Sequence, residues 1–217
     1  MIDMANTQKN APAALLQTDW LRREAAALGF DDLRVSDTDL EQAGIRLQQW
    51  LAQGYHGDMD YMSRHASLRT QPNELHPGVI RVITVALNYL PDDHRFRTAV
   101  NWRDQEFTQT TQPEKAVISV YARGRDYHKV LRQRLQRLAD VIVNRMGPFG
   151  YRVFVDSAPV MEVELAQKSG LGWRGKHTLL LNREAGAMFF LGEIFVNIPF
   201  ELDKPISSHC GECSACI

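Results

Sequence analysis

The three cysteines of the chain are the residues whose spacing points most directly to a chemistry. Cys210, Cys213 and Cys216 lie in the segment CGECSAC, with two residues between successive thiols. One tight turn at this spacing can direct three sulfur atoms to the same cluster, as in ferredoxin-type 4Fe–4S sites. Zinc also binds thiolates, but zinc sites usually take cysteines from two separated Cys-x2-Cys arms. The spacing therefore favours an iron–sulfur cluster over zinc, and over three ordinary buried cysteines. Because the chain ends inside this motif, at Ile217, we expect a fragment of a longer protein.

Asp156 is the second candidate for chemistry. It follows an apolar run in FVDSAPVME, residues 154–162, where a strand is expected to end and a helix to begin. In α/β folds, ligands meet the protein at the carboxyl ends of strands. Asp156 could cap the following helix through backbone N–H groups. It could instead be a proton donor, which requires a pKa raised by burial. The residues alone leave both interpretations open.

A glycine-rich segment and a basic segment are further candidates. In GLGWRGKHTLLLN, residues 170–182, three glycines allow a ligand to approach the backbone, and Lys176 and His177 supply hydrogen-bond donors. A glycine-rich turn is more often structural, and this one is neither a Walker loop nor a dinucleotide fingerprint. The basic segment YARGRDYHKVLRQRLQR places Arg125 and Lys129 away from the apolar stripe of a helix. Such a face is usually only solvated, but it also suits a tRNA backbone.

Composition limits the class of protein. The chain has 217 residues, of which 44% are hydrophobic and 24% charged, so one sizeable domain with an appendage is expected. The formal charge of −1 excludes a globally basic surface, though not a local basic patch. No apolar run reaches the ~18 residues of a membrane span. The N-terminus lacks the features of a secretory signal, so residues 1–15 are expected to be a flexible lead-in and the protein cytoplasmic.

The elements that must position these residues follow from hydrophobic periodicity. A helix is expected from Thr18 or Asp19 to Gly29, and a stronger one from Asp126 with an inward stripe of Leu131, Leu135, Leu138 and Ile142. Further helices are expected over 40–51, with Ile45, Leu47 and Leu51 inward, after the HGDMDYM turn, and over 160–169. A loop is expected over 91–113. Strands are expected over 33–35, 79–87, 116–121, 152–155, 178–181 and 188–196. Alternating strands and helices predict a layered α/β (α+β) domain.

Taken in order, these segments resemble epoxyqueuosine reductases, from about Trp20 to the end of the chain. The resemblance is carried by YHGDMDYM (55–62), LRTQPNELHPG (68–78), VALNYL (85–90), GRDYHKVLRQRL (124–135), FVDSAPVME (154–162), GLGWRGKHTLLLNREAG (170–186), FFLGEIFVNIPF (189–200) and CGECSAC (210–216). It implies a nitroreductase-like, cobalamin-binding domain, as in reductive dehalogenases, over residues 16–203. The start of a ferredoxin-like 4Fe–4S segment would follow over residues 204–217, with a helical-repeat tail beyond it.

The resemblance also implies an activity and its partners. Epoxyqueuosine in a tRNA anticodon loop would be reduced to queuosine, the last step of queuosine synthesis. Cobalamin would be the cofactor, with electrons from a donor passing through two 4Fe–4S clusters in the full-length family, in a protein expected to be a monomer. Asp156 would protonate the departing oxygen. Arg69, Tyr121, Lys176 and His177 would line the cobalamin pocket together with Asp156, and Cys210, Cys213 and Cys216 would bind iron.

Two positions depart from the pattern of the family. Val120 stands where an arginine is common before the Tyr-Ala pair, and Val163 stands where an arginine commonly follows Glu162. Valine forms no hydrogen bonds, so contacts to phosphate or to corrin amides could be weaker. Two alternatives therefore remain: a related cobalamin-dependent reductase of another substrate, and a non-catalytic fragment that binds cobalamin.

Overall fold

The computed structural model describes residues 16–90 and 102–215. Its centre is a four-stranded sheet in the order β1-β2-β6-β3, in which every neighbouring pair is antiparallel. The strands are β1 (Asp32–Ser36), β2 (Arg81–Asn88), β3 (Tyr151–Val155) and β6 (Phe189–Val196). The layered α/β prediction is confirmed in this coarse form, with antiparallel pairing throughout the sheet.

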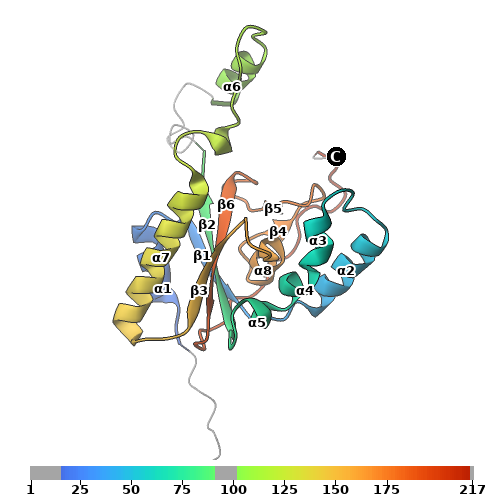
Figure 1. The fold of residues 1–217 in the computed structure, drawn as a ribbon. Helices are drawn as coiled ribbons and strands as arrows, with labels where there is room; N and C mark the ends of the chain where they lie inside the picture. Colours follow the sequence, from blue (N-terminus) through green and yellow to red (C-terminus); the bar gives the residue numbers. More distant parts are fainter. Residues whose placement is uncertain (1–15, 91–101, 216–217) are drawn as a thin grey trace, which may run out of the picture.

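Helices cover both faces of the sheet (Figure 1). One face carries α1 (Asp19–Ala27) and α7 (Tyr127–Met146), and the other carries α8 (Glu162–Lys168). A group of shorter helices continues the second layer: α2 (Glu41–Ala52), α3 (Asp60–Arg64), α4 (Ala66–Thr70) and α5 (Pro72–Leu75). The sheet therefore has a hydrophobic core on each side, which explains why β2 and β6 are apolar on both faces.

The amphipathic pattern of α7 is confirmed. Leu131, Leu135, Leu138 and Ile142 are all buried against the sheet. The Asp126 side chain accepts a hydrogen bond from the His128 backbone N–H and so caps the helix. At the sheet, Gly192 allows close packing, because a Cβ atom there would lie 2.8 Å from Leu135 Cδ1. This packing fixes the first turn of α7 beside the end of β3.

Three local predictions are wrong. Residues 116–121 do not form a strand: Val120–Ala122 is a 3-10 turn, and the Ile118 side chain is exposed. Apolar residues of this segment line a surface groove instead of a sheet, which β-propensity cannot distinguish. Within the predicted loop 91–113, α6 (Trp102–Thr110) is helical and projects from the body (Figure 1), while residues 91–101 lie outside the described part. Ile45 points outward and not into the core.

The glycine-rich segment forms a small hairpin. Strands β4 (Trp173–Arg174) and β5 (Leu180–Leu181) pair antiparallel, although only the second was expected. A Cβ atom on Gly172 would lie 2.3 Å from the Leu181 carbonyl oxygen, so the close pairing requires glycine there. Within residues 16–90 and 102–215, none of the helices is both long enough and apolar enough to cross a membrane.

Candidate active site

Asp156 lies directly after β3, at the end of the sheet where α7 begins. The Tyr127 hydroxyl donates a hydrogen bond to Asp156 Oδ2, and His128 Nε2 lies 2.8 Å from Asp156 Oδ1. Asp156 is not the cap of the next helix, because α8 begins at Glu162 with Met161 in the cap position. The structure therefore excludes the cap interpretation, and the role of Asp156 as a proton donor stays a prediction.

His128 connects Asp156 to a second carboxylate. His128 Nδ1 lies 2.9 Å from Asp126 Oδ1, on the ring side opposite Asp156. The hydrogen bond from the His128 side chain lowers the pKa of Asp126 below its usual value, and the positive charges of His128 and Lys129 add to this effect. Each ring nitrogen of His128 therefore lies against a carboxylate oxygen, which fixes the orientation of the imidazole.

Tyr127 is fixed by aromatic contacts. Its ring is stacked on Phe190, with a centroid distance of 4.1 Å and an interplanar angle of 2°. Tyr121 meets it edge-on at 6.3 Å, and the His128 ring is stacked on it at 4.0 Å. Burial, followed by the hydrogen bond to Asp156, raises the pKa of Tyr127, so the phenol keeps its proton. The Tyr127 hydroxyl is therefore a permanent donor to Asp156.

A pocket of about 130 Å³ opens beside this group of side chains. Asp156, Glu162 and Tyr127 supply its polar lining, and the remaining lining is apolar, with Leu179 and Phe190 among it. Burial, and secondly the charge of Asp156, raise the pKa of Glu162 to about 7. The charge of Arg69 opposes that increase. Arg69 Nε is itself buried without a hydrogen-bond partner among the described residues.

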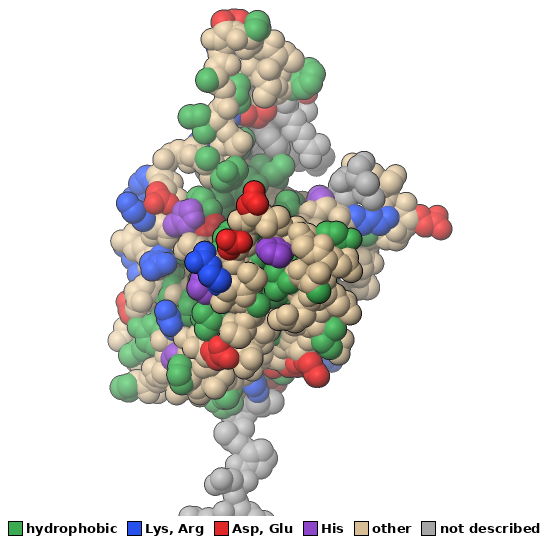
Figure 2. Space-filling view, turned by 45° about the vertical axis from the view of Figure 1, so that its right-hand side comes forward, with side chains coloured by type: hydrophobic (Ala, Val, Ile, Leu, Met, Phe, Trp, Pro, Cys, Tyr) green, Lys and Arg blue, Asp and Glu red, His purple; other side chains and the backbone are tan. Residues whose placement is uncertain are grey.

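A larger apolar groove of about 400 Å³ adjoins this pocket. Tyr121 lines the groove and also contacts Tyr127, so it connects the groove with Asp156. Val120 is a lining residue as well, which means that the first departure from the family pattern faces this groove. Figure 2 shows hydrophobic side chains gathered where the α6 segment meets the body.

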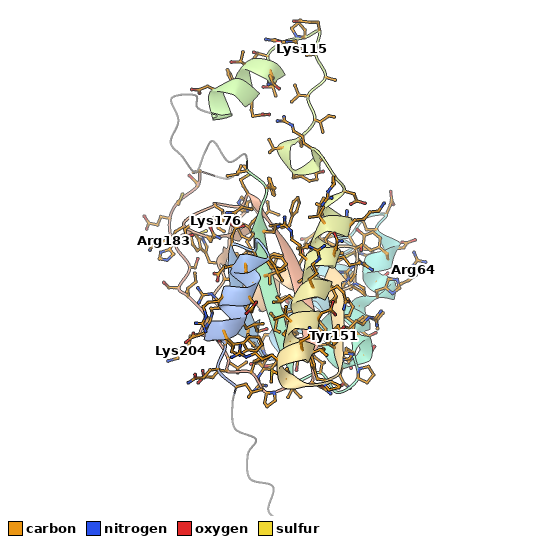
Figure 3. The ribbon with its side chains drawn as sticks, turned by 90° about the vertical axis from the view of Figure 1, so that its left-hand side faces the viewer. Arg64, Lys115, Tyr151, Lys176, Arg183 and Lys204 are labelled. Carbon is orange, nitrogen blue, oxygen red and sulfur yellow. The ribbon has the colours of Figure 1, made fainter. Side chains whose placement is uncertain are left out.

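Lys176 and His177 lie on the turn between β4 and β5, and neither lines the pocket of Asp156. Lys176 Nζ donates to the Cys213 carbonyl oxygen at 2.8 Å, so it contacts the C-terminal segment. In Figure 3, Lys176 lies on the same side of the molecule as Arg183 and Lys204. His177 Nδ1 accepts a hydrogen bond from the Leu179 N–H at 3.2 Å. Of the predicted cofactor-binding residues, Asp156 lines the pocket and Tyr121 lines the adjoining groove, whereas Arg69, Lys176 and His177 line neither.

Cys210 and Cys213 are free thiols on one turn, in which the Cys213 N–H donates to the Cys210 carbonyl oxygen at 2.8 Å. Cys216 lies outside the described residues. Among the residues that are described, no three His, Cys, Asp or Glu side chains form a group suited to a metal ion. Arg125 and Lys129 are exposed around the start of α7, on either side of His128 in the sequence.

Sequence reasoning missed four residues of this region: Tyr127, His128, Glu162 and Glu193. Glu193 gave the clearest signal, because it is a lone acid within the apolar strand FFLGEIFV. A charged residue inside a strand buried on both faces is rarely there for packing. Tyr127 and His128 belong to the expected helix start and to the segment GRDYHKVLRQRL, but nothing local predicts that Asp156, 29 and 28 positions later, is their partner.

Comparison with known proteins gives one family. The model "Epoxyqueuosine reductase QueG, DUF1730" matches residues 69–157. The epoxyqueuosine reductase of Alicycliphilus denitrificans is 53% identical over 193 residues, which are 89% of this chain and 52% of the relative. That of Pseudomonas aeruginosa is 50% identical over 209 residues, 95% of this chain and 54% of the relative. The chain therefore spans about half the length of these curated relatives.

Solved structures agree in fold. One is an epoxyqueuosine reductase from Bacillus subtilis, described with its aspartate catalytic loop swung out of the active site. It has a TM-score of 0.71 at 25% identity, and the match covers 91% of this chain and 49% of the B. subtilis chain. An epoxyqueuosine reductase with a modified tRNA stem loop has a TM-score of 0.67 at 23% identity, over 90% of this chain and 49% of its own. A catabolic reductive dehalogenase has a TM-score of 0.50 at 14% identity, over 87% of this chain and 20% of its own, and shares the fold alone.

Proposed function

We propose that this chain, which belongs to the epoxyqueuosine reductase family and spans about half the length of its curated relatives, is the catalytic domain of an enzyme that reduces epoxyqueuosine in tRNA to queuosine. The observation that carries the proposal is Asp156, held between the Tyr127 hydroxyl and His128 at the mouth of a pocket. The B. subtilis structure is described with an aspartate catalytic loop swung out of the active site, and a catalytic aspartate in that protein supports this assignment.

The proposed reaction adds two electrons and two protons to the epoxide and releases one water. Asp156 is the group placed to protonate the departing oxygen, because it is the half-exposed carboxyl at the pocket mouth. In the structure its two oxygens lie against the Tyr127 hydroxyl and His128 Nε2. The reaction consumes two protons and Asp156 can give only one at a time, so Asp156 must regain a proton before the second transfer.

Cobalamin is the proposed cofactor, and the surface around the pocket is suited to it. Three large side chains are exposed there without an apolar partner to cover them fully: Tyr121 by 49%, Leu179 by 55% and Met188 by 39%. A macrocycle with a broad apolar face would cover such a surface. Tyr121, Leu179 and Met188 would hold it beside Asp156, with Arg69 as a nearby cation. When bound, cobalamin supplies the low-potential reducing centre that delivers electrons to the epoxide carbon.

Cobalamin binding is the first test of the proposed function. Titrating cobalamin into the anaerobically purified chain should shift the absorbance spectrum of the cofactor. Leu179→Asp, which places a charge on the apolar surface, should weaken binding at least about tenfold, because burying an unpaired carboxylate costs several kcal/mol. Leu202→Asp is the matched control, since Leu202 is similarly exposed but does not line the pocket or the groove. Equal weakening by both variants, or no spectral shift at all, would contradict the assignment of this surface.

The proposed catalytic domain covers residues 16–203, and the proposed iron–sulfur segment begins at residue 204. Leu16 pairs with the segment around Phe200, and the Asp203 N–H donates to the Val35 carbonyl oxygen at 2.9 Å. Both ends of the domain are thus joined to it by backbone bonds. Cys210, Cys213 and Cys216 would hold a 4Fe–4S cluster, since three thiols at this spacing can face one cluster. An external donor would supply its electrons.

Arg125 and Lys129 are proposed to bind the tRNA backbone. Both side chains are exposed. They lie on either side of His128 in the sequence, around the start of α7, and His128 contacts Asp156. Replacing both by alanine should weaken tRNA binding and reduce the slope of log K against log salt by about 1.4–1.8, because each phosphate contact contributes roughly 0.7–0.9. Arg137→Ala, a change to an exposed arginine two turns further along α7, is the control and should leave the slope unchanged. An unchanged slope in the double variant would mean that this face is only solvated.

A further inference from the structure

Glu193 is a carboxyl group buried in the centre of the sheet. It lies on β6 opposite Thr84 of β2 and Phe154 of β3, and its side chain is fully inaccessible to solvent. Neither carboxyl oxygen has a hydrogen-bond partner among the described residues, and the Thr84 hydroxyl is also unpartnered. An isolated ionised carboxylate in such a place would cost many kcal/mol, so Glu193 holds its proton. The interior beneath the site is therefore a region in which carboxyl groups stay neutral.

Glu162 is a second carboxyl group of the site that contains Asp156. It is the first residue of α8 and lines the same pocket as Asp156. The charged groups that act on it are Asp156, which favours its protonated form, and Arg69, which favours its carboxylate. Its own charge would in turn raise the pKa values of Tyr127 and Glu193. Because of burial and Asp156, the pKa of Glu162 is about 7, so it can both hold and release a proton near neutral pH.

We propose that Glu162 is the residue that returns a proton to Asp156 during each catalytic cycle. The inference rests on the proposed function, because it answers the proton demand of epoxide reduction. The pocket shared by the two carboxyls, about 130 Å³, exceeds the ~30 Å³ occupied by one water, so water can connect them. His128 is a less suitable source, since it does not line this pocket and its second ring nitrogen lies against Asp126.

The steps balance as follows. Two electrons from the reductant and one proton from Asp156 open the first carbon–oxygen bond and leave a hydroxyl group on the neighbouring carbon. Glu162 then transfers its proton to the Asp156 carboxylate. Asp156 gives this second proton to the hydroxyl as the second carbon–oxygen bond breaks, which releases water and leaves a carbon–carbon double bond. Solvent reprotonates Glu162 and Asp156 through the pocket mouth. The cycle consumes two electrons and two protons for each water formed.

Glu162→Gln tests the proposal in a protein of the relatives' full length that carries this chain. The wild-type turnover rate should fall as pH rises through about 7, because Glu162 then loses the proton that it must donate. Glu162→Gln should lower turnover at neutral pH at least about tenfold and abolish that fall. Glu164→Gln is the matched control on the same helix. Its carboxylate is paired with Arg46 at 3.0 Å and Arg174 at 2.7 Å and does not line the pocket.

A second measurement needs neither cofactor nor substrate. Infrared titration of the 217-residue chain should show a protonated-carboxyl band that disappears with a midpoint near pH 7, is absent in Glu162→Gln and remains in Glu164→Gln. Wild-type turnover by Glu162→Gln, or a band that this variant leaves unchanged, would overturn the relay. Absence of epoxyqueuosine reduction by the wild-type protein would overturn the proposed function, and the relay with it, even if the infrared band were present.

Discussion

Asp156→Asn should lower epoxyqueuosine reduction by at least about 100-fold, the usual contribution of a general acid. Asparagine nearly matches aspartate in shape and can still accept the hydrogen bond of the Tyr127 hydroxyl, but it cannot transfer a proton to the departing oxygen. Cobalamin binding should remain, because the apolar surface formed by Tyr121, Leu179 and Met188 is untouched. Single-turnover reduction of tRNA that carries epoxyqueuosine is the measurement.

Three variants separate the chemistry of Asp156 from its surroundings. Asp156→Ala should be as slow as Asp156→Asn, since both lack a transferable proton. Tyr127→Phe should be affected less, because it removes one donor to Asp156 and keeps the aromatic stacking on Phe190. Asp140→Asn, on the exposed side of α7, should retain wild-type turnover. Turnover near the wild-type rate in Asp156→Asn would remove Asp156 from the role of acid.

Glu193→Met should stabilise the chain, by on the order of 1–3 kcal/mol at pH 8 and by less at pH 5. Methionine has a similar volume and no unpartnered oxygens, and a buried polar group without a hydrogen-bond partner costs about this amount. Burial raises the pKa of Glu193 above its usual value, so the folded chain keeps a proton there that the unfolded chain releases as pH rises. Urea denaturation at the two pH values measures the difference.

Glu162 adds to this pH dependence in the same direction. Its pKa rises from 4.5 in the unfolded chain to about 7 in the folded chain. The stability due to its protonated form is therefore complete below about pH 4.5 and is lost as pH rises to about 7, a change of roughly 3 kcal/mol. Glu162→Gln should flatten the stability curve over this range, whereas Glu164→Gln should retain the slope. A wild-type stability that does not change between pH 5 and pH 8 would contradict the raised pKa values of both Glu162 and Glu193.

The sequence by itself determined the elements whose signals are local. The spacing of Leu131, Leu135, Leu138 and Ile142 sets the buried face of α7, and Asp126 caps its start. The apolar runs of β2 and β6 predict strands covered on both faces. The ordered motifs that resemble epoxyqueuosine reductases singled out Asp156, because a motif keeps its residues together in the chain.

Only the tertiary structure decided which side chains meet. The partners of Asp156 come from α7, and the pocket between Asp156 and Glu162 depends on where α8 rests on the sheet. The segment 116–121 is a second example. Its apolar residues fit a strand locally, but in the fold they line a groove. Burial and the neighbouring Asp156 raise the pKa of Glu162, and both arise only from packing. Periodicity and capping act over a few residues, whereas burial, pairing and electrostatic coupling depend on distances in space that a linear pattern does not contain.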